Sequence, residues 1–118
     1  MIYTIEYSGK WLSLNEVYNS NRYVAAATKR EWKAKFRKMF TDANITPFTT
    51  FKLLLVYNSR FDCENTVAGL KIAVDILREL GLVENDDKRY YKGVAIEYDN
   101  TLTHNIYIIK LMTDIDCK

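Results

Sequence analysis

The sequence predicts an α+β fold: a single domain with a mixed four-stranded sheet and two main helices. Its 118 residues suit one core of modest size. Hydrophobic residues make up 48% of the chain and charged residues 27%, which is typical of a globular domain. Segments with strand and helix periodicity follow one another in the order β-α-β-α-β-β, which favours helices packed on a mixed sheet. We expect this domain to span residues 1–118, with 113–118 frayed.

The first half of the chain is expected to supply one strand, one loop and one helix. Residues 1–8 alternate in polarity and predict a strand. Residues 9–21 are polar and aromatic and predict a loop. Residues 25–40 predict a helix, for which Thr28 would be the cap and Glu31 its partner three residues later.

The second half is expected to supply a central strand, a buried helix and two further strands. Residues 51–57 form a continuous apolar run, which is typical of a central strand. The helix that follows is expected to end at Gly81, as a glycine after the last helical turn. Residues 90–97 and 105–112 predict the last two strands, which a turn at 99–101 would join as antiparallel neighbours.

Carboxylates occur on both sides of the second predicted helix. Asp62 and Glu64, with Asn65 beside them, precede it, and Asp86 and Asp87 follow it. Helix capping alone could explain Asp62, because a helix N-terminus favours a carboxylate by about 0.3–1 kcal/mol. If the chain doubles back so that the two pairs meet, their repulsion would require a cation or a proton between them. Oxygen ligands of this kind suit Mg²⁺ or Mn²⁺.

A polar stripe is expected along the same helix. The residues at i, i+4, i+7 and i+11 share one face and are Glu64, Ala68, Lys71 and Asp75. Cys63 is expected to be a free thiol in the core. His104, the only histidine, is expected to be a turn residue. The chain has no glycine-rich phosphate loop and no Ser/His/Asp spacing, which argues against nucleoside triphosphate hydrolysis and acyl transfer.

Basic residues crowd into the first predicted helix. Six of them fall within ten residues: Lys29, Arg30, Lys33, Lys35, Arg37 and Lys38. The formal net charge is only +2, so the clustering is more informative than the total. Cations that hold a polyanion, beside carboxylates that hold a metal ion, suit a protein that cuts phosphodiesters. A solvated helix face is the alternative.

These motifs together resemble the RusA family of Holliday junction resolvases. The shared order is Asp62-x-Glu64-Asn65, a helix with a lysine and an aspartate four residues apart, Leu-Gly-Leu-Val, and Asp86-Asp87. The opening Ser13-Leu14-Asn15, with Tyr18 and Arg22-Tyr23, is similar to the beginning of that family. Glu64 stands where the family has aspartate. Lys71 lies about one helical turn beyond the family's lysine position, which Ala68 occupies.

The resemblance implies a Mg²⁺- or Mn²⁺-dependent endodeoxyribonuclease that resolves Holliday junctions by paired symmetric nicks in DNA recombination and repair. The implied catalytic residues are Asp62, Glu64, Asp87 and Lys71, and the implied metal ligands are Asp62, Glu64, Asp87 and Asp86. The expected DNA contacts are Lys29, Arg30, Lys33, Arg37, Arg22, Arg60 and Asn15. The expected partner is four-way-junction or branched DNA, bound by a homodimer without a nucleotide cofactor.

No apolar stretch approaches the ~20 residues that span a membrane, so a cytoplasmic protein is expected. Three alternatives stay open at this point. The first is a nuclease for other branched or flap DNA, and the second is a DNA-binding protein without catalysis. In the third, Asp62 is a helix cap, Asp86 and Asp87 belong to a turn, and no metal binds.

Overall fold

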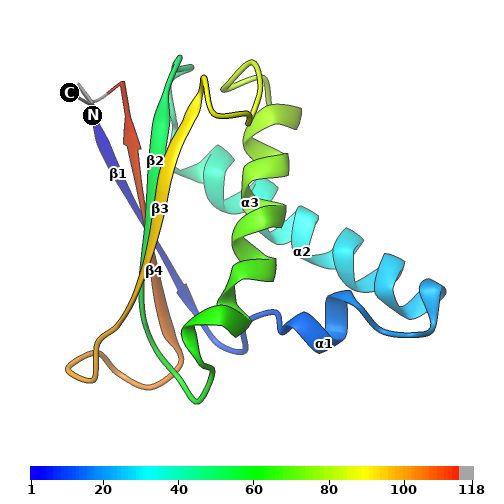
Figure 1. Cartoon of the computed structure of the whole chain (residues 1–118). Coiled ribbons are helices and arrows are strands. Elements are labelled where there is room, and N and C mark those ends of the chain that lie inside the picture. Colours follow the sequence, from blue (N-terminus) through cyan, green and yellow to red (C-terminus); the bar gives the residue numbers. More distant parts are fainter. Residues whose placement is uncertain (115–118) are drawn as a thin grey trace.

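In the computed structural model, which describes residues 1–114, the helices pack against one face of a four-stranded sheet (Figure 1). The elements are β1 (Ile2–Ser8), α1 (Leu14–Val17), α2 (Arg22–Asp42), β2 (Phe51–Asn58), the 3₁₀ turn η1 (Cys63–Thr66), α3 (Val67–Glu79), β3 (Tyr91–Tyr98) and β4 (Ile106–Thr113). The predicted α+β class, with a mixed sheet and two main helices, is confirmed.

The strand order is β1-β4-β2-β3. β2 pairs in parallel with β3 and antiparallel with β4, and β4 also pairs antiparallel with β1. The prediction that residues 51–57 form a central strand is therefore confirmed. The prediction that the last two strands are antiparallel neighbours is wrong, because β2 lies between them.

Residues 99–101, which the sequence predicts as a hairpin turn, belong to the connection that carries the chain around the end of β2. The side-chain amide of Asn58 donates a hydrogen bond to the carbonyl oxygen of Leu102 (2.7 Å), and the Asn105 N–H donates to the Asn58 carbonyl oxygen (2.6 Å). Every second residue of β4 is buried, whereas every residue of β3 is half-buried or exposed. Placing β4 inside the sheet and β3 at its edge therefore buries the more apolar strand.

α2 begins three residues earlier than predicted because Asn21 caps it. The Asn21 side chain accepts a hydrogen bond from the Tyr23 N–H (3.0 Å), and the predicted cap, Thr28, lies inside the helix. The loop before α2 contains the short α1, which the sequence did not predict. Ser13 and Glu16 form a reciprocal capping box at its start.

Trp11 joins the segment after β1 to the beginning of α3. Its ring stacks on Tyr107 with 4.6 Å between centroids, and its Nε1–H donates to the Thr66 carbonyl oxygen (3.0 Å). Gly69 makes this contact possible, since a Cβ atom there would lie 2.6 Å from the indole. The N-terminal end of α3 is thus fixed against the sheet.

The predicted end of α3 is confirmed. Gly81 has a φ of 72°, and the Leu82 N–H donates to the Leu77 carbonyl oxygen (3.0 Å), which satisfies the end of the helix.

The prediction of fraying from residue 113 is wrong for the two residues that the structure describes. Thr113 belongs to β4, and the Asp114 carboxylate accepts hydrogen bonds from the N–H groups of Thr49 and Thr50 (both 2.9 Å). Residues 115–118 lie outside the described part of the chain.

Replacing Gly69 with alanine tests the contact with Trp11. We expect the free energy of unfolding to fall by about 1–3 kcal/mol, as for other overpacked cores, although alanine is the better helix former. Urea denaturation measures this change. Gly93→Ala is the matched control, because nothing lies within 4 Å of a Cβ at that position. Equal stability of the two variants would contradict the packing described.

Candidate active site

The acidic residues singled out in the sequence lie at opposite ends of α3. Asp62 and Glu64 precede the helix, beyond the carboxyl end of β2, and Asp86 and Asp87 follow it, before the parallel strand β3 (Figure 1). The 13 residues of α3 separate the two pairs by roughly 20 Å. The four carboxylates therefore do not come together within one chain. Residues 1–114 contain no group of three or more His, Cys, Asp or Glu side chains that could hold a metal ion.

Asp62 and Glu64 are both exposed on the turn before α3. Asp62 is the N-cap residue of η1, but its side chain makes no capping hydrogen bond, so the interpretation of Asp62 as a helix cap is wrong. Within residues 1–114, neither carboxylate belongs to an ion pair. The turn thus presents two free carboxylates to solvent.

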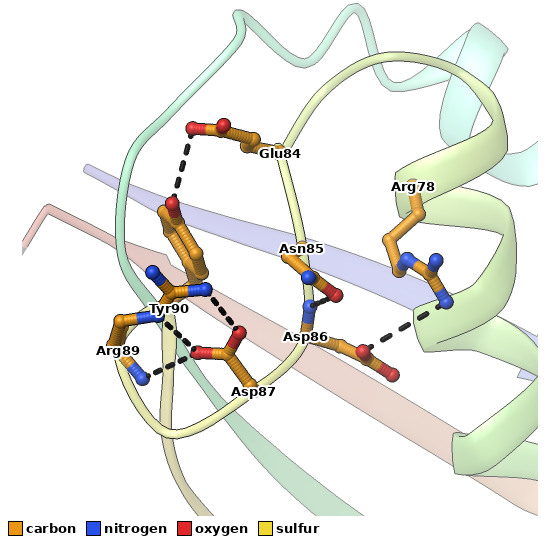
Figure 2. A network of polar contacts seen from close by, with 7 residues as sticks. All are labelled: Arg78, Glu84, Asn85, Asp86, Asp87, Arg89 and Tyr90. Atoms are coloured by element: carbon orange, nitrogen blue, oxygen red, sulfur yellow. Dashed lines mark hydrogen bonds and ion pairs between the residues drawn. The ribbon is translucent and has the colours of Figure 1, made fainter.

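The carboxylate of Asp87 is engaged by Arg89 (Figure 2). The guanidinium donates to both carboxylate oxygens, at 3.0 and 2.8 Å, and the Arg89 N–H donates to one of them at 2.9 Å. These hydrogen bonds, the guanidinium first, lower the pKa of Asp87 to about 2. A metal ion at Asp87 would have to replace this partner. Asp86 is held more loosely, with its carboxylate 3.8 Å from the Arg78 guanidinium.

A groove of about 470 Å³ follows α3 on the side of β3. It is walled mainly by aliphatic side chains, namely Val67, Leu70, Val74, Val94 and Ile96. Val67 begins α3 and Asp86 lies beyond its end, so the groove follows the helix along its length. At the η1 end, the Cys63 sulfur lies 4.0 Å from the Ile96 carbonyl oxygen. Cys63 is exposed there, so the expectation that it lies in the core is wrong.

The predicted polar stripe on α3 is only partly present. Lys71 and Asp75 line the groove, but Ala68 is 3% exposed and belongs to the core. In the described part of the chain, Lys71 takes part in no ion pair. Its ammonium group therefore stays available in the stretch between the two acidic pairs.

The predicted DNA-binding residues of α2 fall into two groups. Lys33 and Arg37 each lie 3.5 Å from the Glu79 carboxylate of α3, so both also join the two helices. Lys29 and Arg30 are exposed on the earlier part of α2, and no ion pair involves them within the described residues. These two remain free to contact a polyanion.

The other predicted DNA contacts are spread over the surface. The Arg22 guanidinium lies 5.3 Å from the centroid of the Tyr23 ring, and Asn15 is exposed in α1. Arg60 lies in a separate pocket with Lys10 and His104. The sequence did not associate the last two with any site, because no local pattern connects residues so far apart.

No protein-family model matches this chain, and no curated protein is similar enough to count as a relative. The likeness to the RusA family thus depends on the motifs quoted above. Among residues 1–114, we find no helix with both the length and the apolarity needed to cross a membrane.

Substituting Asp62 with alanine separates a structural role from a functional one. We expect the free energy of unfolding to stay within about 0.5 kcal/mol of wild type, because the side chain makes no capping bond. Asn21→Ala is the matched comparison and should lose about 1 kcal/mol, since Asn21 does cap α2. Chemical denaturation measures both, and a similar loss in Asp62→Ala would restore the capping interpretation.

Proposed function

We propose that this chain is a Mg²⁺- or Mn²⁺-dependent endodeoxyribonuclease that acts as a homodimer on branched DNA, including four-way junctions. The resemblance of its motifs to the RusA family suggests the activity. The observation that carries the proposal is the position of the two acidic pairs, one near each end of an open apolar groove.

A second copy of the chain would bring the two pairs together. A two-fold axis through the middle of the groove sets the α3 helices of the two protomers antiparallel. Asp62 and Glu64 of one protomer would then lie beside the partner's Asp86 and the partner's Asp87. Two such sites would form, one at each end of the paired grooves.

The groove has the character that such an interface needs. Its walls are mostly aliphatic, and β3 is an edge strand of the sheet. Val94 is 53% exposed within it, and Tyr98, at the end of the same strand, is 55% exposed. Exposed apolar side chains that cluster in this way are typical of surfaces that bind another protein.

The chemistry follows from the residues that would surround the substrate. The carboxylates of Asp62, Glu64 and the partner's Asp87 would hold the cation, with the partner's Asp86 beside them. The cation would supply Lewis acidity and lower the pKa of the attacking water. Lys71 would stabilise negative charge on the phosphoryl group. Asn65 would orient a water molecule or a carboxylate.

The basic residues would hold DNA without reading its sequence. Lys29 and Arg30, exposed on α2, would contact backbone phosphates. A two-fold dimer presents equivalent sites, which suits paired nicks in a four-way junction with the same symmetry. We place this activity in the cytoplasm.

Mixing two inactive variants tests the composite site directly. Asp62→Asn and Asp87→Asn should each abolish Mg²⁺-dependent nicking alone, while junction binding stays largely intact. In a mixed dimer, one site receives both substitutions and the other receives neither. After subunit exchange of equal amounts, about a quarter of the wild-type nicking rate should return, because about half the dimers are mixed and each has one complete site.

The control is a mixture of Asp62→Asn with Glu64→Gln, which substitutes the same half of the site. No mixed dimer of that pair contains a complete site, so activity should stay absent. Failure of the first mixture to recover, with both variants dimeric and folded, would contradict the composite site. Full activity of Asp62→Asn alone would contradict the nuclease. Junction binding without nicking by the wild type would favour the alternative of a DNA-binding protein without catalysis. The sequence feature that favours this alternative is Ala68, which stands at the family's lysine position.

Lys71→Ala tests the part played by the displaced lysine. Loss of one group that stabilises developing charge typically lowers kcat by about 10²-fold or more, and we expect a loss of that size with junction affinity unchanged. Lys110→Ala, on the strand face away from the helices, is the control. An unchanged rate in Lys71→Ala would remove Lys71 from the chemistry.

A further inference from the structure

A second pocket lies at the end of the sheet, where the ends of β1 and β2 meet the start of β4. It has a volume of about 250 Å³. Basic side chains from three separate segments line it: Lys10 after β1, Arg60 after β2 and His104 before β4. We propose that this pocket binds a phosphate group.

The segments that form the pocket are fixed to one another by backbone hydrogen bonds. The Gly9 N–H donates to the Asn105 carbonyl oxygen (2.9 Å), and the Asn105 N–H donates to the Asn58 carbonyl oxygen (2.6 Å). Trp11 and Tyr107, both buried and stacked on each other, contribute part of its lining. The backbone positions of the segments that line the pocket are therefore set by the fold.

The turn that carries Arg60 is also held in place. The Tyr57 hydroxyl donates to the Phe61 carbonyl oxygen (2.7 Å), and the Phe61 N–H donates to the Ser59 hydroxyl oxygen (3.2 Å). The Tyr107 hydroxyl donates to the same Ser59 oxygen (2.5 Å). Since this oxygen accepts two hydrogen bonds, the Ser59 proton is left to donate to a group in the pocket.

The polar groups around the pocket favour an anion. No acidic residue is among those that line it, and within residues 1–114 neither Arg60 nor His104 belongs to an ion pair. Lys10 lies 3.7 Å from the Glu16 carboxylate, but its side chain is 73% exposed, and such a pair contributes little. A guanidinium, an ammonium, an imidazole N–H and a hydroxyl together match the oxygens of a phosphate.

The pocket stands on its own geometry and does not require that the chain cuts DNA. In the proposed nuclease, the pocket would bind a phosphate of the DNA strand near the cut, because Arg60 is two residues from Asp62. The phosphate could equally come from free inorganic phosphate. The experiment below separates these sources.

The test measures binding without Mg²⁺, so that cutting plays no part. A fluorescein-labelled single-stranded 12-mer of mixed sequence is titrated over a series of KCl concentrations. We expect Arg60→Gln to bind about tenfold more weakly, and the slope of log K against log[KCl] to fall by about 0.7, which corresponds to one lost phosphate contact. Lys10→Gln should act in the same direction and serves as the second variant if Arg60→Gln does not fold.

Lys110→Gln removes the same charge from the open face of the sheet and should change the affinity less than twofold. In parallel, inorganic phosphate is titrated while the NMR signal of the His104 ring is followed. Loss of oligonucleotide affinity in the pocket variants supports a nucleic-acid phosphate, and loss of the phosphate response alone supports free phosphate. The proposal is overturned if the pocket variants behave like Lys110→Gln with both probes. Because no divalent cation is present, these results do not depend on whether the chain cuts DNA, and failure of the nuclease proposal would appear only in the nicking assays.

Discussion

The contact between Trp11 and the start of α3 is the constraint on which both proposed sites depend. The indole hydrogen-bonds to Thr66, fits over Gly69 and stacks on Tyr107, so one side chain joins the N-terminal segment, the helix and the sheet. The same contact fixes the turn that carries Glu64, and Trp11 supplies part of the lining of the proposed phosphate pocket. Asp62 and Glu64 of the proposed metal site and the whole of the proposed phosphate pocket therefore lie at the end of the sheet where this tryptophan is buried.

The length of α3 explains why the two acidic pairs do not meet within one chain. β2 and β3 are parallel, so the connection between them must carry the chain from the carboxyl end of β2 back to the end of the sheet where β3 begins. α3 makes that return. Asp62 and Glu64 therefore lie at one end of α3, and Asp86 and Asp87 lie at the other. Asp87 is satisfied by Arg89 in the isolated chain, whereas Asp62 and Glu64 lack such a partner in the described structure. The proposed antiparallel pairing of two copies would place Asp62 and Glu64 beside the partner's Asp86 and the partner's Asp87.

The sequence predicted features that depend on local patterns. The apolar run at 51–57 and Gly81 each have one physical interpretation, as a buried strand and a helix end, and the structure agrees. The hairpin at 99–101 was wrong because a turn between two strands has the same local residues as a connection that crosses a third strand. The grouping of Lys10, Arg60 and His104 was missed because it depends on the place of β4 between β1 and β2. Strand order is a property of the whole sheet, and local periodicity does not contain it.

The central claim is that the metal site exists only between two copies of the chain. The most direct measurement combines sedimentation velocity with electron paramagnetic resonance of Mn²⁺ over a dilution series. The account predicts a dimer that binds Mn²⁺, loss of binding as dilution produces monomers, and loss of both in Val94→Glu, which places a charge in the groove. A monomer that retains Mn²⁺, or a dimer that is undisturbed by Val94→Glu, would contradict it.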